Sequence, residues 1–218
     1  MNKQSEENWT PYKMKKELAA KIAIVSALIT LVSFGYKFTI GILATSLVMI
    51  IAAVPTLFVF ICKAVFAKNM NQTRAQKVKG YFIMMIAAMS FSAIFILFSV
   101  LKVGGIDITN KNRFEGWIGI VFIFFIIALF ALSIINLNKA MNKNDILQIG
   151  LKEITFISAL ADAVMIQEFL YRVILKYAKI PFLSTVNRIF PLAIGVLMVL
   201  VSITMVKRYI DYKKEIDH

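Results

Sequence analysis

The sequence predicts an all-α integral membrane protein, a six-transmembrane-helix bundle with both termini in the cytoplasm. Of its 218 residues, 60% are hydrophobic and 17% are charged, whereas a soluble domain of this size is usually about 45–50% apolar and about 25% charged. The mean hydropathy of +0.78 is also higher than soluble domains show and is typical of a membrane protein. The chain also contains six apolar runs of roughly the length that crosses about 30 Å of hydrocarbon at about 1.5 Å per residue.

The six runs define a transmembrane domain over residues 18–206, between an N-terminal segment (1–17) and a C-terminal tail (207–218). Four of the predicted spans carry no charge: 39–62, 80–101, 116–138 and 189–206. The first span, 18–36, carries only Lys21, near its start. The fifth span, 154–175, is the hardest to insert because it carries three charged residues: Asp162, Glu168 and Arg172.

The placement of basic residues predicts the orientation. Most of the 25 Lys and Arg residues lie in segments 1–17, 63–79, 139–152 and 207–218, and basic connections stay on the cytoplasmic side. Lys37 is assigned to the first outer connection. The net charge of +13 is therefore interpreted as an orientation signal that contacts anionic lipid headgroups, and no nucleic-acid partner is expected. We expect a multi-pass protein of the cell membrane, namely the cytoplasmic membrane of a bacterium.

Asp162 is the most informative residue, because an acid near the middle of a span costs free energy and usually has a role. Thr155, Ser158 and Asp162 follow i, i+3, i+7 spacing, which places them on one face of a helix. This stripe predicts a candidate intramembrane polar site for a cation, a proton or a partner helix. The alternative is a buried acid that joins helices through hydrogen bonds.

Glu168 and Arg172 form a candidate ion pair at i, i+4 spacing. The string Gln167–Glu168–Phe169–Leu170–Tyr171–Arg172 resembles the Glu-Glu-x-x-x-Arg motif of the CAAX-protease and bacteriocin-processing family, with Gln167 in place of the first acid. That family also needs intramembrane histidines, and the only histidine here is His218. These departures argue against protease activity, and the chain is not assigned to the family.

Pro55, inside the second span, is a candidate helix kink, since proline removes one backbone hydrogen bond of a helix. Such a kink serves as a hinge in some transporters and has no role in many other membrane helices.

The sequence predicts no enzyme, no cofactor and no metal site. It contains no phosphate-binding glycine loop, no metal-ligand cluster and no Ser/His pair for nucleophilic catalysis. The leading hypothesis is a non-catalytic accessory or partner-binding subunit that contacts a membrane protein partner or forms a homo-oligomer. The alternative is a small transporter or channel that uses Asp162, and an intramembrane enzyme is third.

Overall fold

The computed structural model describes residues 9–43, 47–105, 145–177 and 181–217, together with 124, 127, 130–135 and 137–138. All regular secondary structure in this part of the chain is helical. The helices are α2 (Trp9–Leu43), α3 (Leu47–Asn69), α4 (Arg74–Val103), α6 (Ile146–Tyr177) and α7 (Pro181–Asp217).

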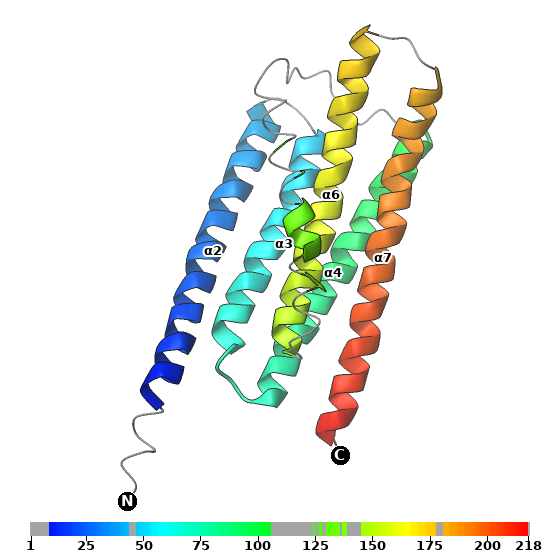
Figure 1. Cartoon of the computed structure of the whole chain (residues 1–218). Coiled ribbons are helices and arrows are strands. Elements are labelled where there is room, and N and C mark those ends of the chain that lie inside the picture. The colour runs from blue at the N-terminus through cyan, green and yellow to red at the C-terminus, as the bar shows by residue number, and fades with distance from the viewer. Residues whose placement is uncertain are drawn as a thin grey trace, which may run out of the picture.

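The helices lie side by side as an elongated bundle, with α2 at one edge (Figure 1). The start of α2 and the end of α7 lie at the same end of the bundle, at the bottom of that view. We call this the basal end. Two ion pairs agree with this arrangement, because Lys77 in the first turns of α4 bonds to Asp145 before α6, and Arg74 bonds to Glu215 near the end of α7.

Buried side chains form a core that joins α4, α6 and α7. The largest fully buried side chains include several from these helices: Tyr81, Met84, Phe91, Leu147, Ile157, Met198 and Met205. Gly150 lets α6 approach α4 closely, since a Cβ atom there would lie 2.6 Å from Cδ2 of Tyr81. In contrast, α2 packs on α3 and on no other described helix.

The outward surfaces of the bundle are apolar, which is the pattern that lipid contact requires. Exposed fractions reach 72% for Val32 on α2, 63% for Leu97 on α4 and 71% for Phe182 on α7, where Ile203 is 57% exposed. Three described segments are long and apolar enough to cross a membrane: Lys21–Thr39, Arg74–Val103 and Ser184–Ile216. These findings support a membrane-embedded, all-helical protein.

The first helix ends later than the sequence pattern suggested. The predicted first span stopped at residue 36 and the second began at 39, but α2 continues to Leu43 and α3 begins at Leu47. Gly35 and Tyr36 resemble a membrane interface, yet a single glycine is tolerated inside a helix. Lys37 therefore lies within α2 rather than in an outer connection.

Helices α4, α6 and α7 extend beyond their predicted spans at both ends, because a helix need not stop where its apolar run stops, whereas α3 begins later than its predicted span and ends beyond it. Most of the predicted span 116–138 lies outside the described residues; those described within it are helical.

Candidate functional site

A series of ion pairs connects α6 to three other helices. Four acidic residues lie on α6 or immediately before it, and each bonds to a basic side chain from elsewhere in the bundle. The pairs are Asp145–Lys77, Glu153–Arg208, Asp162–Lys37 and Glu168–Lys102. We call this set the ion-pair ladder. At about 1.5 Å per residue it follows α6 for about 35 Å, roughly the thickness of a bilayer core.

The Asp162 pair joins α2, α3 and α6. Nζ of Lys37 donates to Oδ1 of Asp162 at 2.9 Å and to Oγ1 of Thr56 at 3.2 Å. Only 7% of Asp162 and 8% of Lys37 is exposed. A buried charge is costly unless it is paired and hydrogen-bonded, and here both conditions hold. The acid that stood out in the sequence is therefore compensated by a partner 125 residues away in the chain.

The other residues of the predicted polar stripe are placed differently. Oγ1 of Thr155 donates to the carbonyl oxygen of Leu151 at 2.6 Å, one turn earlier in the same helix. Ser158 is buried on α6. The hydrogen-bonding groups around Asp162 thus come from α2 and α3, through Lys37 and Thr56, and the sequence pattern along α6 did not reveal them.

Glu153 forms a second buried junction, between α4, α6 and α7. The hydroxyl of Tyr81 donates to Oε2 of Glu153 at 2.9 Å, and Arg208 bonds to Oε1. Glu153 is 4% exposed. A sequence signal existed, because Tyr81 lies at the start of the predicted span 80–101 and Arg208 lies just after the predicted span 189–206. Which acid they would meet depended on how the helices packed.

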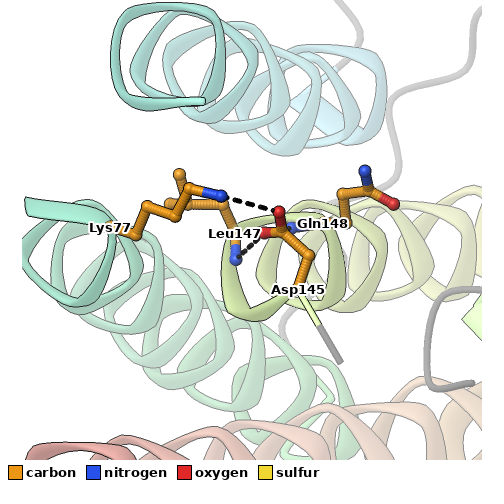
Figure 2. A network of polar contacts seen from close by, with 4 residues as sticks. All are labelled: Lys77, Asp145, Leu147 and Gln148. Carbon is orange, nitrogen blue, oxygen red and sulfur yellow. Dashed lines mark hydrogen bonds and ion pairs between the residues drawn. The ribbon is translucent and has the colours of Figure 1, made fainter. Parts of the chain in front are cut away.

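Asp145 caps the start of α6 and ties it to α4 (Figure 2). Its Oδ1 accepts hydrogen bonds from the backbone N–H groups of Leu147 at 3.0 Å and Gln148 at 3.3 Å. Its Oδ2 accepts from Nζ of Lys77 at 2.9 Å. An aspartate at this position satisfies backbone donors that the first turn leaves without partners. The same side chain therefore begins the helix and fixes its neighbour.

Glu168 pairs with a residue that its local spacing did not suggest. It bonds to Lys102 at the end of α4, and both residues are buried. The side chain of Arg172 lies outside the described residues, so the Glu168–Arg172 pair stays a prediction. Neighbouring Gln167 donates from Nε2 to Oδ1 of Asn187 on α7 at 2.9 Å. Lys102, which directly follows the predicted span 80–101, is part of the ladder.

Pro55 is fully buried within α3, and the helix continues on both sides of it. The kink predicted there stays a prediction.

Comparisons with protein-family models, with curated proteins and with solved structures found no match. Across the residues that the structure describes, no group of three or more His, Cys, Asp or Glu side chains could hold a metal ion. The arrangement neutralises buried carboxylates with lysine and arginine, and it binds helices to one another.

Proposed function

We propose that this protein is a non-catalytic, six-span protein of the cell membrane, with both termini cytoplasmic, that acts as an accessory or partner-binding subunit. The host membrane we propose is the bacterial cytoplasmic membrane. The observation that carries the proposal is the enclosed Lys37–Asp162 pair. A transport site must exchange its ligand with water, whereas this carboxylate is buried and bonded to an ammonium group of the same chain.

The exposed side of α2 supports the partner-binding part of the proposal. Because α2 packs on α3 alone among the described helices, much of its apolar surface faces outward, including Ile29, Val32 and Tyr36. Lipid tails are as apolar as these side chains, so a second helix can replace them at little cost if it packs well. A membrane protein partner or a second copy of this chain fits such a surface.

A small transporter or channel is the second candidate, and one observation favours it. Lys37 reaches Asp162 although α2 and α6 do not pack against each other. Separating the pair would therefore not require two packed helices to come apart. In this alternative Asp162, with Thr155 and Ser158, would carry a proton or cation.

Ion flux in liposomes distinguishes the two candidates. Wild-type protein, Asp162→Asn and the exposed basal control Glu215→Gln are reconstituted, and proton and potassium leak are followed with a pH-sensitive dye and an ion electrode. We expect all three to match empty liposomes. A flux that wild type and Glu215→Gln share, and that Asp162→Asn abolishes, would overturn the accessory role in favour of transport.

A photo-crosslinking residue on α2 provides the positive test. It replaces Val32 in one variant and, as a matched exposed control, Ile203 on α7 in another. Irradiation of intact cells is expected to give one discrete protein adduct from position 32, identified by mass spectrometry as a partner or as a second copy. If both positions give lipid adducts alone, the partner-binding role is wrong.

A further inference from the structure

Among the described helices, α6 carries the acids that most directly oppose membrane insertion. Its predicted span, 154–175, contains Asp162 and Glu168, whereas the predicted spans inside α4 and α7 contain no charged residue. Both acids are buried in the bundle, with exposed fractions of 7% and 5%. An acid inside a span costs free energy when the helix meets lipid alone. The stability of α6 in a membrane therefore depends on the groups that other helices offer to these acids.

The base that meets Asp162 belongs to α2, a helix that does not pack against α6. Nζ of Lys37 lies 2.9 Å from Oδ1 of Asp162 and 3.2 Å from Oγ1 of Thr56 on α3, which packs against both helices. The hydroxyl of Thr56 is neutral, so within this group of three residues Lys37 balances the charge of Asp162. The ion pair therefore links α2 to α6 where helix packing does not.

Chain order places the bases before the acids. Lys37 precedes Asp162 by 125 residues, and Lys102 precedes Glu168 by 66 residues. Both lysines have therefore been synthesised before α6 leaves the ribosome. The opposite order occurs at Glu153, one residue before the predicted span, whose basic partner follows 55 residues later in the chain. The two acids inside the predicted span thus meet bases that are made before them.

We propose that Lys37 is the partner that lets α6 cross the membrane, so that pairing with α2 retains α6 in the bilayer together with its own apolar residues. Polar groups on neighbouring helices associate in lipid, because the alternative is an uncompensated group in hydrocarbon. The inference goes beyond the accessory role, and it rests on the proposed six-span placement, in which α6 crosses from the basal end to the outer side.

Labelling of a cysteine placed after α6 measures how often this helix crosses. Lys179→Cys is combined with Cys62→Ala in the full chain, the parent, and intact cells are treated with a membrane-impermeant maleimide. The labelled fraction, normalised to labelling after lysis, reports the chains whose residue 179 is outside. We expect most parent chains to be labelled. Adding Lys37→Met should lower the fraction roughly threefold or more, because Asp162 then enters hydrocarbon without its charge partner.

The orientation signal cannot produce this decrease. Lys37 lies toward the end of α2 opposite the basal end, which the proposed topology places outside. Removing a positive charge from the outer side favours the same orientation under the positive-inside rule. A loss of crossing in Lys37→Met would therefore come from the missing partner of Asp162.

Two matched variants separate the ion pair from general damage. Lys37→Met/Asp162→Leu removes base and acid together and should restore the labelled fraction to the parent level. Lys63→Met removes another lysine that bonds α3 to α2, through the carbonyl oxygen of Ser26 and Oγ1 of Thr30, and should leave the fraction unchanged.

Three results would overturn the coupling of α6 to α2: an unchanged fraction in Lys37→Met, a decrease that Lys37→Met/Asp162→Leu does not reverse, or an equal decrease in Lys63→Met. A parent chain that is labelled only after lysis would overturn the six-span placement itself, and the coupling with it.

Discussion

The two sides of the bundle are held together in different ways. Helices α4, α6 and α7 share a core of buried aromatic and methionine side chains, such as Tyr81, Phe91 and Met198. Helix α2 rests on α3 and exposes most of its apolar residues. In a membrane, apolar burial against lipid gives no hydrophobic driving force, so close packing and polar pairs determine which helices stay associated. The comparison separates a three-helix group, α4, α6 and α7, that shares one buried core from an edge helix, α2, that packs on a single neighbour.

The ion-pair ladder is the feature that both sides share. Its Glu153 pair lies inside the group formed by α4, α6 and α7, whereas its Asp162 pair connects that group to the edge helix α2. The same chemistry therefore stabilises a packed core in one place and bridges unpacked helices in another.

The largest loss of stability is expected from Glu153→Ala, which removes the buried acid shared by α4, α6 and α7. It leaves the buried Tyr81 hydroxyl and the partly exposed Arg208 guanidinium without their acceptor. Removing one partner of a buried ion pair costs about 3–5 kcal/mol. The free energy of unfolding, measured by titration with SDS in mixed micelles, should fall by that amount. Tyr81→Phe, which removes one hydrogen bond, should cost only about 1 kcal/mol. If Glu153→Ala is as stable as wild type, the buried Glu153 pair does not stabilise the group formed by α4, α6 and α7.

An intermediate effect is expected from a methyl group added at Gly150. Its Cβ would lie 2.6 Å and 2.8 Å from two ring carbons of Tyr81, so α4 and α6 would have to shift. Such overpacking costs about 1–3 kcal/mol. Gly35→Ala on α2 is the matched variant, since nothing lies within 4 Å of the added Cβ. We expect Gly35→Ala to leave Tm unchanged or slightly higher. If both variants lower Tm equally, the close packing at Gly150 and the open space at Gly35 do not determine stability.

The smallest effect is expected from Arg74→Ala at the exposed basal surface. Arg74 pairs with Glu215, and more than half of each side chain is exposed to solvent. Its guanidinium also lies 6.0 Å from the centre of the Tyr212 ring on α7. Exposed pairs contribute about 0–1 kcal/mol, so the SDS unfolding free energy should change by less than about 1 kcal/mol. A loss as large as that of Glu153→Ala would show that burial does not rank these pairs.

Much of the fold, and part of the site, could be predicted from residue order. The apolar runs predicted helices where α4 and α7 occur, and α6 forms as a helix despite the charges of its predicted span. Asp162 was singled out as an unusual residue, and it lies in a buried junction of three helices. Its partner was missed because Lys37 follows Gly35 and Tyr36, a local pattern typical of a membrane interface.

Composition and the length of each apolar run were enough to establish a helical chain suited to lipid, because both properties are local. The sequence also identified acids inside a predicted span, Asp162 and Glu168, that need a basic or hydrogen-bonding partner. The packing of the helices then selected which base meets which acid: Lys37 with Asp162, and Lys102 with Glu168. This choice could not be made from residue order, because a helix presents its side chains to whichever helices pack beside it. That packing depends on side-chain shape and charge across segments far apart in the chain.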